Sequence, residues 1–439
     1  MSTFESTALI GLGKVGLPLA AALASRGVSV WAFDNDPVRR SLLAGRDTSR
    51  LEIASEKGLA EILGRNDLDL EVCERLDSAI GKSSIVFAVV PTPSASDGSF
   101  DLTCVEQVIR DVAAVAGDRS LPLLVVLVST VSPGSITDRL LPLIESLSVG
   151  SVPAMLSFCY SPALIALDNV VDGFLQPDFA FIGEVDRSGA DRLEAYYRQL
   201  LGVAVPIHRM SAQSVEIAKL ALNNFLTLKI SFANMIGHLC QATPQADAGQ
   251  VLDALGKDSR IGPKFLQCGQ GFGGPCLPRD NAALAAALVG KRLPAGLPEA
   301  ALDLNLRHAA LLVERLDLAN AGTVGIVGLG YKTASGVTID SFSVRLANEL
   351  ARAGNSVRAY QEQAERMDFS ALSPDIVVSD NLAGAGGECD VVVLTSLTDR
   401  SAHLLDEGEH GPRIVLLGGS AETGSIRTVT QFGKGRSGN

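Results

Sequence analysis

One cysteine lies in a glycine- and proline-rich stretch whose residue types could carry chemistry. Residues 269–280 read Gly-Gln-Gly-Phe-Gly-Gly-Pro-Cys-Leu-Pro-Arg-Asp, which places a thiol at Cys276 and a carboxylate at Asp280. Glycines let the backbone approach a ligand closely, prolines stiffen the loop, and a thiol with an acid one helical turn away suits covalent catalysis. A buried structural cysteine beside a turn, the usual position of a reduced thiol, fits the same pattern.

A lysine and an asparagine share one face of a long predicted helix. Apolar residues recur every three to four positions from Ser211 to Cys240, which predicts a helix over that range. Lys219 and Asn223 are four residues apart, so they project from the same side. Together they could stabilise a developing oxyanion. The periodicity alone favours a solvated helix face, and a helix this apolar should pack against flanking domains or a second subunit.

These groups need a scaffold, and the N-terminal residues predict a dinucleotide-binding unit. The elements expected in order are a strand, a glycine-rich turn, a helix, a second strand and an acid, at 8–10, 11–16, 17–25, 28–33 and Asp34. In this arrangement Gly11 makes the turn, Gly13 admits the pyrophosphate and Gly16 lets the helix pack on the strand. The carboxylate of Asp34 would accept hydrogen bonds from ribose hydroxyls, which predicts NAD rather than NADP.

Two further predicted strands end at threonines. Apolar strands over 84–90 and 121–128 are followed by Thr92 and Thr130. Ligands of open parallel sheets bind beyond the carboxyl ends of the strands, so both threonines could line a cofactor crevice. Ordinary turn chemistry at strand ends explains them equally well.

The C-terminal part of the chain repeats the order of strand, turn and helix with changed details. A strand leads into Gly328-Leu-Gly330, no third glycine follows, and Gln361 stands where the first unit has Asp34. This pattern predicts a second Rossmann-like half adapted to a different nucleotide. We therefore expect an α/β fold with two Rossmann-like domains on parallel sheets, joined by a central long-helix segment. The expected domains are 1–205, 206–300 and 301–439.

Composition and charge exclude several classes of protein. The chain has 439 residues, of which 47% are hydrophobic and 20% charged, and its net charge is −12. This globular composition is sufficient for two or three domains, and the acidic balance argues against a nucleic-acid partner. No run reaches the roughly 18 apolar residues of a membrane span, and the first residues lack a signal peptide's basic region. The seven cysteines are scattered, so we expect reduced thiols, no metal site and a cytoplasmic location.

In combination, the motifs resemble those of the UDP-glucose/GDP-mannose dehydrogenase family. The likeness extends from about residue 7 to about residue 400 and keeps the family's order. The matching segments are 11–18, 90–93, 97–101, 129–131, Glu216 with Lys219 and Asn223, 229–232, 260–266, 269–280 and the pair Tyr331-Lys332.

The resemblance implies an enzyme that oxidises C6 of a nucleotide-sugar, a UDP-hexose by default, from alcohol to aldehyde to uronic acid, with NAD as cofactor. Cys276 would capture the aldehyde as a thiohemiacetal, and loss of a hydride would leave a thioester that water cleaves. Lys219 and Asn223 would stabilise the alkoxide, while Asp280 and Thr130 would orient water or the proton path. The resemblance also implies a place in polysaccharide biosynthesis.

The resemblance further implies sets of binding residues and a partner. Arg260 would reach the sugar of a neighbouring subunit, so we expect a homodimer, with no membrane and no nucleic acid as partner. The residues implied for the cofactor are Gly11, Gly13, Lys14, Val15, Gly16, Asp34, Arg39, Thr92 and Thr130. Those implied for the nucleotide-sugar are Leu164, Lys219, Asn223, Arg260, Phe265, Leu266, Phe272, Gly273, Tyr331 and Lys332.

Two stretches depart from the family pattern. Ala163 and Leu167 stand where relatives carry glutamates, the first of them the usual acid/base of the thioester step. Residues 336–341 lack an arginine that relatives place near the cofactor. Four alternatives follow: hydrolysis through Asp280 and a water, a changed substrate, a two-electron oxidation that releases the aldehyde, or a silent relative that only binds both ligands. Retention of Cys276, Lys219, Asn223 and Asp280 favours the active four-electron enzyme.

Overall fold

An eight-stranded sheet forms the centre of the first unit, residues Met1–Ala221. Its order is β3-β2-β1-β4-β5-β6-β7-β8, and every neighbouring pair is parallel except β6 with β7. The strands are β1 (Thr7–Ile10), β2 (Val30–Phe33), β3 (Leu70–Val72), β4 (Ile85–Ala88), β5 (Leu123–Leu127), β6 (Leu156–Tyr160), β7 (Ala180–Glu184) and β8 (Ile207–Ser211). Because β1 lies between β2 and β4, the strand order reverses there, and such a switch point is where open α/β sheets bind ligands.

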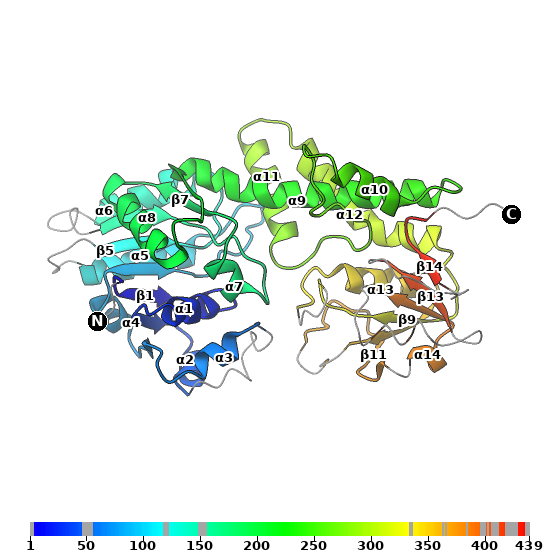
Figure 1. Ribbon diagram of the computed structural model, residues 1–439, viewed down its shortest axis with the longest axis horizontal. Coiled ribbons are helices and arrows are strands. Elements are labelled where there is room, and N and C mark those ends of the chain that lie inside the picture. The colour runs from blue at the N-terminus through cyan, green and yellow to red at the C-terminus, as the bar shows by residue number, and fades with distance from the viewer. Residues whose placement is uncertain are drawn as a thin grey trace. The chain divides into compact units, whose positions relative to one another are not determined.

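The computed structural model describes residues 4–45, 56–116, 123–147, 156–332, 337–361, 364, 367–382, 385–395, 401, 404, 412–417 and 429–434. The chain folds as two units that meet in sequence between Ala221 and Leu222, inside one long helix. Both units are α/β (Figure 1). Within the described part of the chain, no helix has the length and apolar run that a bilayer crossing requires.

Helices cover the first sheet, and the one after β1 is apolar on all sides. In α1 (Gly16–Ser25) every residue from Gly16 to Ala24 is buried, as expected of a helix without a polar face. The remaining elements are α2 (Pro37–Ala44), α3 (Leu59–Leu63), α4 (Leu76–Gly81), α5 (Thr103–Ala116), the π-helix η1 (Ile136–Leu140), α6 (Leu141–Leu147), α7 (Val170–Leu175) and α8 (Arg187–Leu201). The strand side chains Leu9 and Phe87 have no exposed surface, and they join α1 and α8 in one apolar core.

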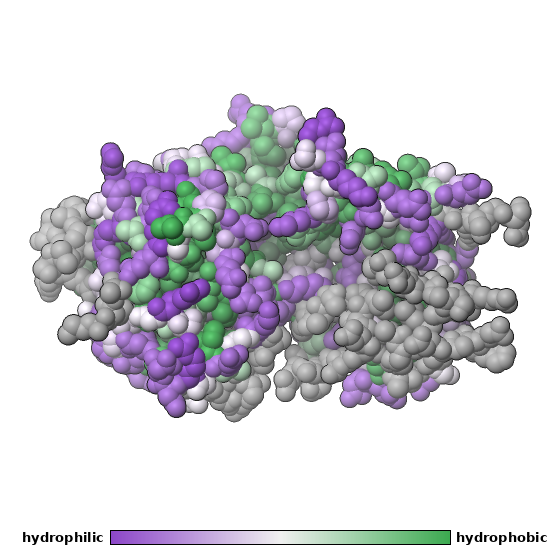
Figure 2. All heavy atoms as spheres, in the orientation of Figure 1, coloured by the Kyte–Doolittle hydropathy of each residue, from purple (hydrophilic) through white to green (hydrophobic). Residues whose placement is uncertain are grey.

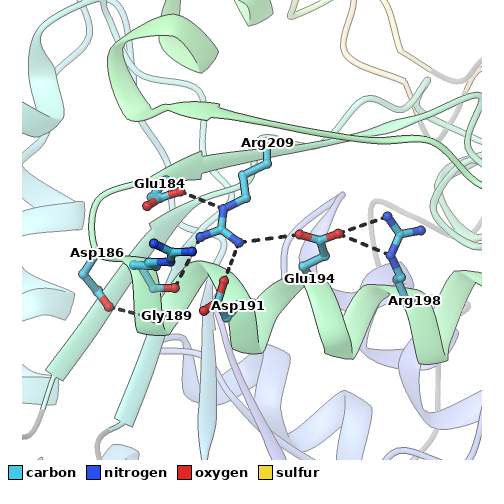
Figure 3. A network of polar contacts seen from close by, with 8 residues as sticks. Glu184, Asp186, Gly189, Asp191, Glu194, Arg198 and Arg209 are labelled. Atoms are coloured by element: carbon cyan, nitrogen blue, oxygen red, sulfur yellow. Dashed lines mark hydrogen bonds and ion pairs between the residues drawn. The ribbon is translucent and has the colours of Figure 1, made fainter.

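An arginine ties the edge strand β8 to its neighbours (Figure 3). The guanidinium of Arg209 lies 2.7 Å from Glu184 on β7 and 2.5 Å from Asp191 on α8. These carboxylates raise the pKa of Arg209 by hydrogen bonding and charge attraction. Because an edge strand has hydrogen-bonding neighbours on one side only, this network supplements the backbone ladder that β8 makes with β7.

The second unit, Leu222–Asn439, contains a six-stranded parallel sheet. Its order is β11-β10-β9-β12-β13-β14, so β9 occupies the switch point as β1 does in the first unit. The strands are β9 (Thr323–Val327), β10 (Ser356–Tyr360), β11 (Val377–Ser379), β12 (Val391–Leu394), β13 (Arg413–Leu416) and β14 (Val429–Gln431). Its core includes Phe342 of α13 (Phe342–Arg352) and Ile326 of β9, both fully buried. The short α14 (Ala385–Glu388) precedes β12.

A 30-residue helix, α9 (Ala212–Gln241), precedes the second sheet. It is followed by α10 (Ala248–Gly256), α11 (Leu277–Gly290) and α12 (Gly296–Arg315). Several polar side chains of α9 are buried and bond residues later in the chain: Asn223, Asn224, Thr227, Ser231 and Asn234.

The fold confirms the predicted α/β class, with two Rossmann-like halves and a long central helix. The helix expected over 211–240 is α9, within one residue at either end. The strand expected over 84–90 ends earlier, at Ala88. After that point the chain turns toward the next loop, because Val90 bonds the hydroxyl of Ser129 through both its N–H and its carbonyl.

Candidate active site

In the glycine turn after β1, two glycines lie too close to neighbouring backbone atoms to carry a side chain, and the third has free space beside it. Gly11 has φ +92°, and a Cβ there would overlap the carbonyl of Val89. A Cβ on Gly16 would overlap the carbonyl of Gly11. At Gly13, by contrast, no atom of the described chain lies within 4 Å of a Cβ built on the backbone. Two glycines are therefore required by the fold, and the third leaves space beside the N-terminus of α1.

A buried carboxylate follows β2 as predicted. Asp34 is 4% exposed and accepts hydrogen bonds from the backbone N–H of Leu12 at 2.7 Å and of Asp36 at 2.9 Å. The guanidinium of Arg39 lies 3.2 Å from the same carboxylate. The glycine turn and the acid are thus joined directly. The space beside Gly13 and the N–H groups at the start of α1, after Lys14 and Val15, fit the diphosphate of a dinucleotide. The fixed carboxylate of Asp34 fits its ribose.

The loops that carry Thr92 and Thr130 contact each other. The hydroxyl of Thr92 donates to the carbonyl of Thr130 at 2.8 Å, and Ser129 bonds Val90. Thr92 is 4% exposed, so part of its role is structural, as the turn interpretation expected. The structure places both threonines beyond adjacent strands, β4 and β5, beside the switch point.

The cysteine loop of the second unit ends at an exposed thiol. Cys276 is exposed and is the N-cap residue directly before α11, with Pro278 in the first turn. The interpretation of Cys276 as a buried structural cysteine is therefore wrong. Asp280 lies one turn into α11, its N–H bonds the carbonyl of Cys276 at 2.8 Å, and it is 1% exposed. The start of a helix favours a thiolate over a thiol, because the N-terminal partial charge is positive.

Asn223 and Asp280 form a buried pair. The Nδ2 of Asn223 donates to Oδ2 of Asp280 at 2.6 Å, and Arg279 approaches the other oxygen at 3.3 Å. Lys219, one turn earlier on α9, is 7% exposed and Asn223 is 8% exposed. The solvated helix face that periodicity favoured is thus wrong, because α9 buries polar as well as apolar residues. A buried ammonium group requires anionic or polar groups around it.

Side chains from two helices hold the beginning of the cysteine loop. Asn234 of α9 accepts from the N–H of Gly269 at 2.8 Å and donates to the carbonyl of Gln270 at 3.0 Å. His308 of α12 lies 2.7 Å from the carbonyl of Gly269. The Nδ1 of His308 in turn lies 2.8 Å from Nε2 of His238.

The middle of the loop is held by an asparagine and an arginine. Asn305 of α12 accepts from the N–H of Phe272 at 2.8 Å and donates to its carbonyl at 2.9 Å. The guanidinium of Arg345 on α13 donates to the same carbonyl at 3.0 Å. Burial lowers the pKa of Arg345.

The remaining glycines of the loop pack on the segment after β9. A Cβ on Gly273 would overlap the carbonyl of Asp340. Gly274 has φ +79°, and a Cβ there would lie 2.5 Å from the ring of Tyr331. The N–H of Gly274 also donates to the carbonyl of Ile339 at 3.0 Å. The structure therefore brings Phe272, Gly273 and Tyr331 together, and the ammonium of Lys332 lies 5.6 Å from the Tyr331 ring centre.

The segment before the loop combines an exposed arginine with a partly buried apolar pair. The Arg260 side chain is 85% exposed and pairs with Asp258 at 2.6 Å in its own turn. Phe265 is half exposed with φ +61°, whereas Leu266 is buried in a small core with α9 and α10.

The stretch that departs from the family pattern lies in the first unit. Ala163 is partly buried against the core of that unit, and Leu164 is also partly buried. Asp168 has φ +64°, a backbone conformation that residues other than glycine rarely adopt. Of the altered stretch 336–341, residue 336 lies outside the described residues.

Several residues of the second unit were not singled out from the sequence: Asn224, Asn234, His238, Asn281, Asn305, His308 and Arg345. Asn281, the residue after Asp280, accepts from Thr227 at 2.8 Å and donates to the carbonyl of Pro298 at 2.7 Å. A signal did exist, because polar residues at 223, 224, 227, 231 and 234 recur at helical spacing inside an apolar helix.

The fold and this site define a two-unit dinucleotide-binding oxidoreductase with an exposed cysteine at the start of a helix. Comparisons give the family. The sequence models of the UDP-glucose/GDP-mannose dehydrogenase family match residues 5–201, as its NAD binding domain, and residues 213–307, as its central domain. The chain belongs to the UDP-glucose/GDP-mannose dehydrogenase family. This membership confirms the resemblance, makes NAD the cofactor and supports NAD-dependent nucleotide-sugar dehydrogenase activity.

Individual relatives agree with this assignment. The chain is 32% identical to a UDP-glucose 6-dehydrogenase of Haloferax volcanii over 91% of this chain and 93% of that protein. It is 26% identical to a GDP-mannose 6-dehydrogenase of Pseudomonas aeruginosa, over 94% and 96% of the two chains. A solved UDP-glucose dehydrogenase of Pyrobaculum islandicum superposes with a TM-score of 0.83 at 29% identity, covering 95% of this chain and 94% of that one.

Proposed function

We propose that this protein oxidises C6 of a UDP-hexose to the uronic acid, with Cys276 as the covalent nucleophile. The observation that carries the proposal is the exposed thiol at the start of α11, one turn from the buried pair of Asn223 and Asp280. NAD, when bound, accepts a hydride in each of the two oxidations. The uridine is supported by UDP-glucose dehydrogenases among the relatives.

The proposed catalytic residues then have distinct roles. The sulfur of Cys276 adds to the C6 aldehyde and forms a thiohemiacetal, which holds the intermediate on the protein. Loss of a hydride from that tetrahedral carbon leaves a thioester, and water cleaves it to the acid. Asp280, fixed by Asn223, holds the proton or the water for this step. Lys219 and Asn223 stabilise the alkoxide, and Thr130 contributes to the proton path.

Recognition of the nucleotide-sugar is proposed for the cysteine loop and the segment after β9. Tyr331 packs on Gly274, and Lys332 is the cation next to it. Phe272 and Gly273 are buried and closely packed, so they would support the neighbouring residues that meet the nucleotide-sugar. Leu164, Phe265 and Leu266 complete the proposed set.

Ala163 supports a second candidate, a two-electron oxidation that releases the aldehyde. A general acid or base contributes on the order of a hundred- to ten-thousand-fold in rate. Without the glutamate of its relatives at this position, the thioester step depends on Asp280 or is slow.

The NADH yield separates these candidates. The purified protein is mixed with NAD and a panel of UDP- and GDP-sugars, and both NADH and uronate are measured at completion. Two NADH per sugar consumed supports the four-electron reaction, one NADH with free aldehyde supports the second candidate, and none with any sugar rejects both. C276S should form no uronate, whereas C104S, which changes another exposed cysteine on α5, should match the wild type.

We also propose that two copies pair through α9. Phe225, Phe232, Met235 and Leu239 are 41% to 62% exposed, and with the partly buried Leu228 they recur at intervals of three and four residues. This spacing is that of a coiled-coil seam, which buries its apolar stripe against a second helix. Figure 2 shows exposed apolar side chains over the region of α9 to α12. An exposed Arg260 is consistent with its proposed role in a neighbouring subunit.

The location proposed for this enzyme is the cytoplasm. None of the seven cysteines, all within the described residues, forms a disulfide. Reduced cysteines are the rule in that compartment.

A further inference from the structure

We propose that Asn234, Asn305 and His308 are positioning residues, which hold the backbone of Gly269–Phe272 and thereby set where Cys276 can react. The proposal rests on the proposed function, in which Cys276 is the nucleophile. It concerns residues that touch the loop and are separate from the reacting groups.

The loop itself has almost no side chains with which to fix its own shape. Four of the seven residues from Gly269 to Pro275 are glycines. Glycine has the largest backbone freedom of any residue, so a glycine-rich loop loses the most conformational entropy on ordering. Much of the ordering must come from outside the loop. Asn234 of α9 and Asn305 and His308 of α12 are buried side chains that bond its backbone. The partly buried Arg345 of α13 adds a further bond.

Gly269 is held at both of its backbone groups. Its N–H donates to Asn234 at 2.8 Å, and its carbonyl lies 2.7 Å from Nε2 of His308. A carbonyl can only accept, so Nε2 of His308 carries the proton. Nδ1 of a neutral His308 then accepts from Nε2 of His238, 2.8 Å away. For neutral rings, these contacts therefore select one tautomer each, with the proton on Nε2.

Burial keeps these rings neutral. It lowers the pKa of His308 to about 3 and that of His238 to about 4. His308 is 2% exposed and stacks on Phe342, with ring centres 4.8 Å apart. The direction of the hydrogen-bond chain, from His238 to His308 to Gly269, is therefore constant near neutral pH.

Phe272 is held as completely as Gly269. Asn305 uses both atoms of its amide on the N–H and the carbonyl of Phe272, and Arg345 takes the second lone pair of that carbonyl. Only Gly273, Gly274 and Pro275 separate this anchor from Cys276. Both glycines are packed against Asp340 or Tyr331, so displacement of Phe272 is transmitted to the thiol.

The test removes one anchor at a time. N305A and N234A remove anchors on different helices, so that one remains informative when the other does not fold. H308Q keeps an N–H for the Gly269 carbonyl, whereas H308L does not. N348A is the matched control, because Asn348 of α13 makes the same paired bonds to another loop, at Ala371 and Ser373.

Three measurements are made on each variant. The first is kcat and KM for the nucleotide-sugar. The second is the rate of Cys276 alkylation by iodoacetamide across pH, resolved by peptide mass spectrometry. The third is hydrogen exchange of the peptide that spans Gly269–Cys276. We expect N305A, N234A and H308L to lower kcat on the order of a hundredfold, as a shift of about 1 Å can do, with little change in KM. Their loops should exchange faster and their alkylation profiles should shift, while H308Q and N348A resemble the wild type.

The outcomes separate this proposal from the proposed function. Folded N305A and N234A proteins with wild-type kcat, alkylation and loop exchange overturn the positioning role. Equal losses in H308L and H308Q overturn it for His308, because rescue by the retained donor is then absent. A wild-type protein that reduces no NAD with any nucleotide-sugar rejects the proposed function, and alkylation and exchange still decide the positioning role.

Discussion

The side-chain amide of Asn223 donates a 2.6 Å hydrogen bond to the carboxylate of Asp280, from the middle of α9 to the first turn of α11. Both residues are almost fully buried, while Cys276, one turn from Asp280, is exposed. An accessible thiol thus precedes a fixed carboxylate by one helical turn, and this arrangement suits covalent catalysis followed by hydrolysis.

The first prediction concerns that carboxylate. D280N replaces the carboxylate with an amide. The pair of Asn223 and residue 280 then contains no group that can take up a proton. We expect uronate formation to fall by on the order of a hundred- to ten-thousand-fold, as measured by steady-state NADH production. D303N removes an exposed carboxylate that pairs with Arg307 on α12 and should keep wild-type turnover. Unchanged uronate output from folded D280N removes Asp280 from the mechanism.

The second prediction separates the two functions of the glycine turn. G13A adds a methyl group where the protein has space, so its unfolding free energy should stay within about 0.5 kcal/mol of the wild type. The same methyl group would occupy the space expected for the diphosphate, so NAD affinity should fall at least about tenfold, by calorimetric titration. G16A forces a methyl group into the Gly11 carbonyl and should destabilise the protein by about 1–3 kcal/mol. G13A with normal NAD affinity contradicts the placement.

The third prediction follows from the two buried histidines. Their pKa values lie below the ordinary 6.5, at about 4 for His238 and about 3 for His308, so the unfolded chain binds more protons. The unfolding free energy should therefore fall as pH drops below about 6.5, by up to roughly 1.4 kcal/mol per pH unit for each ring. Burial is the main cause of both shifts. The charge of Arg315 also opposes protonation of His238, and the charges of His238 and Arg345 oppose protonation of His308.

Urea unfolding at pH 7.5, 6.0 and 5.0 measures this dependence. Unfolding is followed by far-UV circular dichroism. Tryptophan fluorescence would report on the first unit, where the single tryptophan, Trp31, lies, whereas both histidines lie in the second unit. H308Q keeps the donor to Gly269 and should show a smaller loss of stability in acid. H208Q, at an exposed histidine of β8, should keep the wild-type slope. Equal slopes for wild type and H308Q contradict the linkage.

The fourth prediction concerns the α9 seam. F232E places a charge in the centre of the stripe and should convert a dimer to a monomer in sedimentation experiments. V203E is the control, because Val203 is 83% exposed and lies outside α9. If Arg260 acts in the neighbouring subunit, mixing inactive R260A with inactive C276S should restore part of the activity, since each hybrid contains one intact site. A wild-type protein that sediments as a monomer contradicts the seam.

The sequence by itself determined both Rossmann-like halves, and the reason is local. A strand, a glycine turn, a helix and a second strand follow one another within about 30 residues, so spacing alone specifies them. The sequence also indicated Gln361 as the residue of the second half that stands where the first half has Asp34. Leu12 donates to Asp34 at 2.7 Å, and Leu329 donates to Gln361 at 2.7 Å in the equivalent place. The glycine-rich surroundings of Cys276 and the shared face of Lys219 and Asn223 were equally visible.

Only the tertiary structure decided which groups are exposed and which are buried. Periodicity could not separate a solvated polar face from a buried one. Lys219 and Asn223 are both buried, and Asn223 bonds Asp280, which lies 57 residues later in the chain. The exposure of Cys276 and the anchoring of its loop likewise depend on α9, α12 and α13. The sequence does not reveal that Asn234 and Asn305 bond the same loop, because they lie 71 positions apart. Burial and long-range hydrogen bonds are properties of the packed chain, and packing brings these residues to the same loop.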